Sequence, residues 1–269
     1  MPKAHIPHLE MHVTHACNLA CESCSHYSNH HHKGHVELTE ADAWMSAWSR
    51  RVTVGLFSLL GGEPSIHPDL PKFIPLARRH WPRARIEIVT NGFFLDRHED
   101  LPEAMAGNGD VVLAVSVHHD SPDYRARLRP ILDLARRWQV ERGVQVEVRN
   151  SHRHWARRYR GYGDTMSPFD DGKPRLSWEI CSARECRQLF EFKLWKCSPI
   201  AYLELQKRKF RLSPQWDRYL SYRPLESSCE DREIEAFLAR EEEGVCGMCS
   251  AMPRFFAPAN PLATAVSDA

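Results

Sequence analysis

The chain has 269 residues, enough to bury a sizeable core as one large or two modest domains. Its 36 basic and 35 acidic residues nearly balance, so no global field attracts nucleic acid or an anionic membrane, and neither is expected as a partner. No apolar run reaches membrane-spanning length and the first residues lack the apolar core of a signal peptide, so we expect a soluble, cytoplasmic protein whose nine cysteines are metal ligands or reactive thiols rather than disulfides.

The first predicted strand, residues 9–14, alternates apolar and polar side chains and ends at a loop that carries three cysteines. Cys17, Cys21 and Cys24 are separated by intervals of four and three residues. Three thiolates on one short loop can hold three irons of a cubane cluster and leave the fourth iron open to an exogenous ligand. A zinc site is the alternative, but it would need a fourth ligand and prefers pairs spaced as CxxC, which this loop lacks.

The cysteine loop continues into a histidine-rich stretch, residues 26–35, which contains five histidines. A metal site is one interpretation of this composition. Two of the histidines are adjacent, however, and lysine and glycine interrupt the run. These features favour a solvated loop.

Helices and strands then alternate along the chain. Thr39 is predicted to cap a helix over residues 39–50, and residues 52–60 form a nearly uninterrupted apolar run, as expected of a strand buried on both faces. Further helices are predicted at residues 70–80, 94–106 and 130–139, and further strands at 84–90, 110–117 and 144–148. The recurring strand and helix predict a parallel sheet with right-handed crossovers. The predicted fold class is α/β, a partial TIM-like barrel over residues 1–165 in which five strands are legible.

Polar motifs follow three of these strands, and together they resemble the radical S-adenosylmethionine (radical SAM) superfamily. The three cysteines match its CxxxCxxC signature. The family's GGEP motif and its strand end near the cofactor ribose are matched by Gly61, Gly62 and Glu63 before a proline, and by Thr90 and Asn91 before a glycine. The resemblance implies a [4Fe–4S] cluster on Cys17, Cys21 and Cys24, with S-adenosylmethionine (SAM) bound at the open iron.

The resemblance also implies roles for single side chains around SAM. The Glu63 carboxylate is expected to accept hydrogen bonds from the methionine ammonium, while Gly61 and Gly62 let the backbone approach the ligand closely. Ser116, near the end of the fourth predicted strand, corresponds to a polar residue that the family aims at the ribose or the methionine.

An aromatic contact and a histidine complete the first predicted site. The sequence departs from the family at Ser23, where many members carry an aromatic residue, and Tyr27 is predicted to stack near the adenine instead. His118 follows the fourth strand and is a candidate for substrate contact or proton transfer. A buried, hydrogen-bonded structural role is at least as good an interpretation for either His118 or His119.

A basic run follows the fifth predicted strand. Residues 149–160 hold five arginines and two histidines with no acid. A solvated helix face and an anion-binding mouth are equally good interpretations. In the second, guanidinium groups would attract a phosphate, a nucleotide-linked sugar or a carboxylate. Arg149, at the strand end, is the candidate for binding the substrate or deprotonating its alcohol, with binding favoured because arginine is a poor base.

The remaining cysteines lie beyond a stretch rich in Gly, Pro and Asp, residues 161–174, which predicts a domain boundary. A small C-terminal α+β domain is expected over residues 175–255, followed by a flexible tail at 256–269. Residues 186–197 alternate about a turn near Glu191 and predict a β-hairpin with a cysteine at each end. Cys246 and Cys249 form a CxxC that can close a four-thiolate site.

This arrangement looks like the twitch domain, the shorter relative of the SPASM domain, which holds one auxiliary [4Fe–4S] cluster. The resemblance implies four thiolate ligands, taken from Cys181 or Cys186, Cys197, Cys246 and Cys249. Cys181 stands at the usual interval before Cys197 and is slightly favoured. A zinc ribbon is the alternative. The spare thiols, Cys229 and one of Cys181 and Cys186, are bystanders or could give a hydrogen atom to a substrate radical.

The resemblance to the radical SAM superfamily also implies a reaction. Radical SAM enzymes use one electron, here from a flavodoxin or ferredoxin type donor, to cleave SAM to methionine and a 5′-deoxyadenosyl radical that abstracts hydrogen from a substrate. A single auxiliary cluster is the pattern of aminocyclitol dehydrogenases that act on 2-deoxy-scyllo-inosamine. We therefore predict an oxidoreductase or epimerase for an anionic small molecule, such as a sugar, cyclitol or nucleotide-sugar. The alternatives are a peptide-modifying maturase and a non-enzymatic iron–sulfur or zinc protein.

Overall fold

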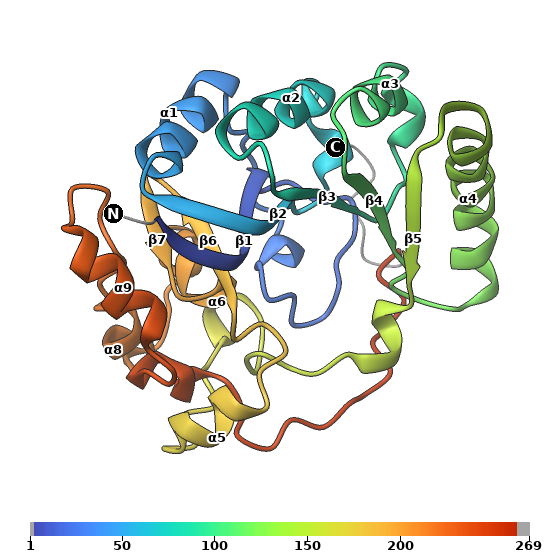
Figure 1. Cartoon of the computed structure of the whole chain (residues 1–269). Helices are drawn as coiled ribbons and strands as arrows, with labels where there is room; N and C mark the ends of the chain where they lie inside the picture. The colour runs from blue at the N-terminus through green and yellow to red at the C-terminus, as the bar shows by residue number, and fades with distance from the viewer. Residues whose placement is uncertain (1–2, 263–269) are drawn as a thin grey trace.

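The structure, a computed structural model, describes residues 3–262, and within them seven strands form one sheet in the order β5-β4-β3-β2-β1-β6-β7. The strands are β1 (Ala4–Thr14), β2 (Val52–Gly61), β3 (Arg85–Thr90), β4 (Val111–Ser116), β5 (Gln145–Arg149), β6 (Cys186–Phe190) and β7 (Lys193–Trp195). Strands β1 to β6 pair in parallel, and β7 runs antiparallel to β6. The predicted α/β partial barrel is confirmed: the strands form an open arc with helices on its outer side (Figure 1).

The outer helices are α1 (Leu38–Ser49), α2 (Leu70–His80), α3 (Leu101–Ala106) and α4 (Pro122–Arg142). α1 is capped by Glu37 instead of Thr39. α4 begins well before the predicted residue 130, because Ser121 accepts the backbone N–H of Tyr124 and proline follows the cap. The predicted helix over residues 94–106 is divided into a 3₁₀ turn, Leu95–Arg97, and α3. Proline at position 102 suits a helix start but cannot donate inside a longer helix.

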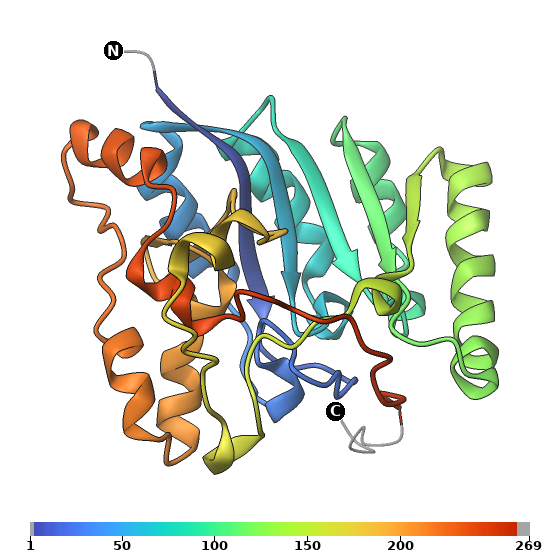
Figure 2. The same cartoon turned by 90° about the horizontal axis from the view of Figure 1, so that it is seen from below.

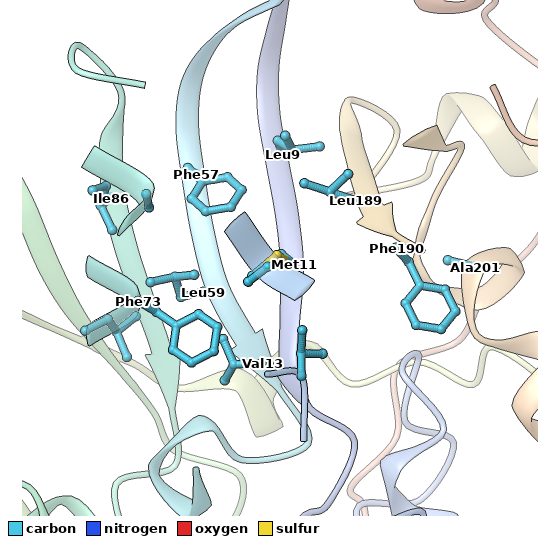
Figure 3. Packing of buried hydrophobic residues seen from close by; sticks show 14 of the residues in the cluster. Leu9, Met11, Val13, Phe57, Leu59, Phe73, Ile86, Leu189, Phe190 and Ala201 are labelled. Carbon is cyan, nitrogen blue, oxygen red and sulfur yellow. The ribbon is translucent and has the colours of Figure 1, made fainter. Parts of the chain in front are cut away.

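Alternate side chains of the strands pack between the sheet and the outer helices. The fully buried members of this layer that Figure 3 labels include Leu9, Met11, Val13, Phe57 and Leu59. The intervening residues of β1, among them His8, Glu10 and His12, therefore lie on the opposite, inner face of the sheet. The sequence thus builds an apolar outer layer and a polar inner face from the same strands.

The predicted hairpin is present as β6 and β7, with Glu191 and Phe192 in the turn at φ of 50° and 65°. β6 also pairs in parallel with β1, a pairing that the sequence did not reveal, so the sheet continues across the predicted boundary at residues 161–174. The hairpin is followed and flanked by short helices: α5 (Pro174–Glu179), α6 (Ser198–Ala201), α7 (Leu203–Lys209), α8 (Asp217–Leu220) and α9 (Asp231–Ala239).

The last described segment runs back along the open side of the barrel (Figure 2). The N–H of Phe256 donates to the Trp155 carbonyl at 3.0 Å, and the N–H of Ala20 donates to the Pro261 carbonyl at 3.3 Å. Part of the tail predicted at 256–269 is therefore fixed against the cysteine loop, and residues 263–269 lie outside the described residues. None of the helices within residues 3–262 is both long and apolar enough to span a membrane.

Candidate active site

The cysteine loop begins where β1 ends, and backbone contacts tie it to the end of β2. The N–H of Gly62 donates to the Thr14 carbonyl at 3.0 Å, and the N–H of Glu63 donates to the Ala16 carbonyl at 2.8 Å. A Cβ at Gly61 would lie 2.1 Å from the Thr14 oxygen, and one at Gly62 would lie 2.1 Å from the Ala16 oxygen. Both glycines are needed here because the two chain segments approach too closely for any side chain.

The buried carboxylate of Glu63, which is 1% exposed, joins the ends of two strands, β2 and β3. One oxygen accepts from the hydroxyl and N–H of Ser65 and from the Thr90 hydroxyl, and the other accepts from the N–H of Asn91 at 2.6 Å. Burial raises the pKa of Glu63, and these donors oppose that shift. Its main role in this structure is therefore to fix the turn after β2 to the end of β3, and only the oxygen that accepts from Asn91 has capacity for a second donor.

A cavity of about 170 Å³ opens where these strand ends meet. Its walls include ten of the predicted site residues: Cys17, Cys21, Cys24, Gly61, Gly62, Glu63, Thr90, Asn91, Ser116 and His118. The parallel sheet explains this convergence, since the carboxyl ends of its strands meet at one edge. The residues predicted for the first site thus line one cavity.

Two buried polar atoms on the cavity wall have no hydrogen-bond partner within the described residues, Ser28 Oγ and His118 Nδ1. Buried polar atoms normally have partners, so unpaired ones beside a cavity suit a bound ligand. Burial, reinforced by His152, lowers the pKa of His118 to about 4, so its imidazole is neutral at physiological pH. Ser28 and the neighbouring wall residue Trp155 were not predicted. Their positions just after the third cysteine and after β5 were the available signal.

Cys21 is buried and Cys17 and Cys24 are half-buried, and loss of solvent around the sulfur raises the pKa of each thiol. For Cys24, the nearby backbone N–H groups of residues 26–29 oppose this shift. Backbone N–H groups near a sulfur stabilise its thiolate form. Cys17 receives a similar contact, with the N–H of Leu19 at 3.4 Å from Sγ.

The spacing of the thiols favours a cluster over zinc. A tetrahedral zinc ion holds thiolates about 3.8 Å apart, given Zn–S bonds of about 2.3 Å. Within residues 3–262, neither cysteine group contains three ligand atoms that lie within 4.8 Å of one another. A cubane separates its thiolates by a whole cluster edge, so the wider arrangement fits iron and sulfide better.

The second cysteine group gathers around the hairpin and the CxxC. Burial raises the pKa of Cys197, and the neighbouring thiols of Cys249, Cys181 and Cys246 raise it further. Burial also raises the pKa of Cys249 to about 11, with Cys181 and Cys246 contributing. Cys181 thus lies near enough to raise the pKa of thiols in both the hairpin and the CxxC. Cys186 lies on the inner face of β6, where the Glu10 carboxylate adds to the effect of burial in raising its pKa.

Two other predicted residues lie away from the cavity walls. Tyr27 is fully buried and its ring centroid lies 5.2 Å from that of Tyr159, so it packs behind the loop, and the predicted stacking on adenine is not supported. Cys229 lies beside α9, where Arg51 donates to its sulfur at 3.6 Å and to its carbonyl at 2.6 Å. This position does not support a hydrogen-donor role for Cys229.

The histidine-rich stretch is solvated only in part: residues 33–35 are exposed, as its composition favours, but residues 27–30 are buried. His30 is 1% exposed, its Nε2 lies 3.1 Å from the Tyr159 hydroxyl, and its ring stacks on Tyr162. His26 lines the cavity, and its Nδ1 lies 2.6 Å from Nε2 of the fully buried His12. Tyrosines far along the sequence and a histidine on β1 provide these contacts, so local composition could not indicate them.

Two of the five arginines of the basic run, Arg149 and Arg157, are paired with carboxylates. Arg149 binds the buried Glu87 and lies 2.7 Å from Glu147, and these bonds raise the pKa of its guanidinium although burial acts in the opposite direction. Arg157 donates twice to Glu22 in the cysteine loop, at 3.0 and 2.7 Å. Arg149 is therefore a structural ion-pair partner in this structure, and the predicted substrate contact or proton abstraction is not supported.

Replacing Arg149 with alanine is expected to lower the free energy of unfolding by about 1–2 kcal/mol, because buried Glu87 loses its cationic partner. This expected loss is smaller than that for a fully buried ion pair, because the Arg149 side chain is 42% exposed and solvent screens its charge. Anaerobic denaturant unfolding measures it. Arg153→Ala, in the same basic run, is the matched control and should stay within about 0.5 kcal/mol of wild type. Unchanged stability with a raised KM for substrate would instead restore the binding role.

Ser23, the departure from the family pattern, anchors this run to the cysteine loop. Its hydroxyl accepts the backbone N–H groups of Arg158 and Tyr159, at 2.8 and 3.3 Å. The Trp155 indole also donates to the Glu22 carbonyl at 2.6 Å. A small hydroxyl at this position therefore allows the segment after β5 to cross directly over the loop.

Comparison with known proteins agrees with this geometry. Residues 11–142 match the radical SAM superfamily, and a search among curated proteins finds no match. The crystal structure of BtrN in complex with AdoMet and 2-DOIA is 18% identical, with a TM-score of 0.52 over 91% of this chain and 89% of that chain. Streptococcus suis SuiB bound to S-adenosylmethionine is 16% identical, with a TM-score of 0.42 over 53% of this chain and 33% of that chain.

The chain thus spans about a third of the length of SuiB, while it shares its fold with BtrN over almost the whole of both chains. The match to the superfamily runs from the second half of β1 to the end of α4, a span that carries the three motifs of the cavity. This chain therefore contains, over residues 11–142, a domain of the radical SAM superfamily, whose enzymes bind a [4Fe–4S] cluster and SAM.

Proposed function

We propose that this protein cleaves SAM reductively and abstracts a hydrogen atom from a small molecule, most simply a sugar, cyclitol or nucleotide-sugar, which it oxidises or epimerises. The observation that carries the proposal is the cavity in which three cysteines, the glycine turn and the ends of β3 and β4 converge. The fold shared with BtrN, a protein crystallised with AdoMet and 2-DOIA, supports a small-molecule substrate. A reaction of this type also needs an external electron donor of the flavodoxin or ferredoxin type.

The residues of the cavity have distinct parts in this proposal. Cys17, Cys21 and Cys24 would hold the cluster, which when bound supplies the electron that cleaves SAM and yields the 5′-deoxyadenosyl radical. Glu63 and Asn91 fix the strand ends that would border the cofactor. The neutral imidazole of His118 presents an unpaired Nδ1 that could accept or donate one hydrogen bond at the cavity wall.

The charge of the substrate is less constrained than the sequence suggested. The anionic character followed from the basic run, and the two arginines of that run nearest to the sheet and the loop are already paired with carboxylates. A neutral polyol is therefore compatible with the site, and an anionic one would have to rely on other arginines of the run.

The enzymatic proposal is tested by incubating the anaerobically reconstituted, reduced protein with SAM and measuring 5′-deoxyadenosine by mass spectrometry. We expect its formation above a control without reductant. If iron and sulfide are confirmed in the protein and none forms, the enzymatic proposal is wrong, and the non-enzymatic alternative takes its place.

The second cysteine group is proposed to hold an auxiliary [4Fe–4S] cluster on Cys181, Cys197, Cys246 and Cys249. Cys181 is preferred to Cys186 because it raises the pKa of all three other thiols, Cys197, Cys246 and Cys249, whereas Cys186 interacts with Cys197 alone. In a dehydrogenation, such a cluster can accept the electron that remains on the substrate after hydrogen abstraction.

Cys197→Ala is expected to contain about four irons per chain, against about eight in the wild type, because one of two cubanes is lost. Formation of 5′-deoxyadenosine should persist, since the first cysteine loop is untouched. Iron and sulfide counting measures the change, and Cys229→Ala, which removes a thiol outside both groups, should keep the wild-type count. A wild-type protein with only about four irons would exclude the auxiliary cluster.

A further inference from the structure

A third group of metal-ligating side chains lies on the inner face of the sheet, outside the cavity and the second cysteine group. His8 and Glu10 belong to β1, and Cys186 belongs to the neighbouring strand β6. The parallel register places His8 opposite Cys186 and Glu10 opposite Gln188. Residues two apart on a strand point to the same side, so these four side chains share one face.

The ligand atoms of this group are close enough to bind one ion. A ring nitrogen of His8, a carboxylate oxygen of Glu10 and the sulfur of Cys186 lie within 4.8 Å of one another, and His8 Nε2 is 3.6 Å from Glu10 Oε1. Tetrahedral zinc ligands lie about 3.3 to about 3.8 Å apart, given bonds of about 2.0 Å to nitrogen and oxygen and about 2.3 Å to sulfur. No other such set occurs among residues 3–262.

Neighbouring polar groups hold the three ligands in place. The amide nitrogen of Gln188, which is fully buried, donates to Glu10 at 2.6 Å and lies 3.6 Å from the Cys186 sulfur. The Ser58 hydroxyl lies 2.8 Å from His8 Nε2 and donates to Glu87 at 3.0 Å. An ion on Nε2 would replace the contact to Ser58, whose oxygen could then accept from a water on the ion. The Gln188 amide, which contacts both Glu10 and Cys186, is the kind of partner that orients ligands in known metal sites.

We propose that His8, Glu10 and Cys186 form a binding site for a divalent cation, with Zn²⁺ as the preferred ion and a fourth position open to water or to an oxygen of a small molecule. One imidazole, one carboxylate and one thiolate make a ligand set of intermediate softness, which suits zinc. Three protein ligands with an open position are typical of zinc sites that act on a ligand. The proposal also assigns a role to Cys186, the thiol that the auxiliary cluster does not require.

The test uses the full chain with its iron and sulfide restored under anaerobic conditions. The protein is equilibrated with Zn²⁺ alone, desalted, and assayed for zinc, iron and sulfide, and the zinc environment is measured by X-ray absorption. We expect about one zinc per chain with no loss of iron, bound by one sulfur at about 2.3 Å and by nitrogen and oxygen at about 2.0 Å.

His8→Ala and Cys186→Ala are each expected to weaken zinc affinity more than about 100-fold, since loss of a ligand should exceed the effect of losing a supporting partner. His8 is partly exposed, so its replacement tests the site without opening the core. His5→Ala is the matched control, because His5 is an exposed histidine of the same strand that contacts Thr53. It should leave zinc binding unchanged.

Three results would overturn the proposal. They are the absence of bound zinc in the wild type, an all-sulfur zinc environment with a matching loss of iron, and unchanged zinc affinity in both His8→Ala and Cys186→Ala. Formation of 5′-deoxyadenosine is measured on the same samples, so failure of the zinc site is distinguished from failure of the radical chemistry.

Discussion

Replacing Cys24 with alanine is expected to abolish 5′-deoxyadenosine formation from SAM and to lower the iron content by about four per chain. Cys24 lines the cavity with Cys17 and Cys21, and all three thiolates are needed to hold three irons of the cluster. Two thiolates on one loop cannot hold a cubane that leaves a single iron open. Mass spectrometry of the SAM cleavage products and iron counting measure the two effects.

Two other cysteine variants make this result specific. Cys229→Ala should retain the iron and the SAM cleavage of the wild type, because Arg51 and α9 hold that residue away from both cysteine groups. Cys197→Ala should lose a similar amount of iron and still cleave SAM. If Cys24→Ala forms 5′-deoxyadenosine at the wild-type rate, the three-cysteine loop does not hold the catalytic cluster.

Gly62→Ala is expected to reduce SAM cleavage about 100-fold, the loss that a displacement of about 1 Å can cause at an active site. The new Cβ would lie 2.1 Å from the Ala16 carbonyl oxygen and 2.8 Å from Cys17 Cβ, so the cysteine loop must move. Crowding of this kind also costs about 1–3 kcal/mol of stability. Initial rates of 5′-deoxyadenosine formation, iron content and anaerobic unfolding measure these effects together.

Gly244→Ala provides the matched control for this substitution. A Cβ at Gly244 meets nothing within 4 Å, and its φ is not in the left-handed region, so rate, iron and stability should stay at wild-type values. Wild-type behaviour of Gly62→Ala would show that the turn after β2 can give way without disturbing the cysteines, and that the close approach does not position the cluster.

The strand ends of the first site could be predicted because the signals are local. Each motif lies at or just beyond the end of an apolar strand, as at Cys17 after β1, Glu63 after β2 and Asn91 after β3. Parallel strands bring their carboxyl ends to one edge, so residues that are distant in sequence must meet there once the strands are recognised. The ten site residues in one cavity follow from that rule.

The partners of individual side chains could not be predicted in the same way. Arg149 appeared available for substrate because no acid lies in its own segment from residue 149 to 160, yet Glu87 comes from β3. His30 appeared solvated by its local composition, yet Tyr159 and Tyr162 cover it. Glu63 was assigned to a ligand, although protein donors already surround its carboxylate. In each case the deciding group lies far away in sequence.

The sequence by itself determined the alternation of strands and helices, the α/β class and the residues that form the first cavity, because periodicity and strand-end motifs are encoded within short segments. Only the tertiary structure decided that β6 pairs with β1, that Arg149 is an ion-pair partner, and that Cys186 lies beside His8 and Glu10. These outcomes depend on which strand edges and which buried charges meet after the chain has folded. A buried polar or charged group without a partner is costly, so the folded state is the one in which such groups are paired.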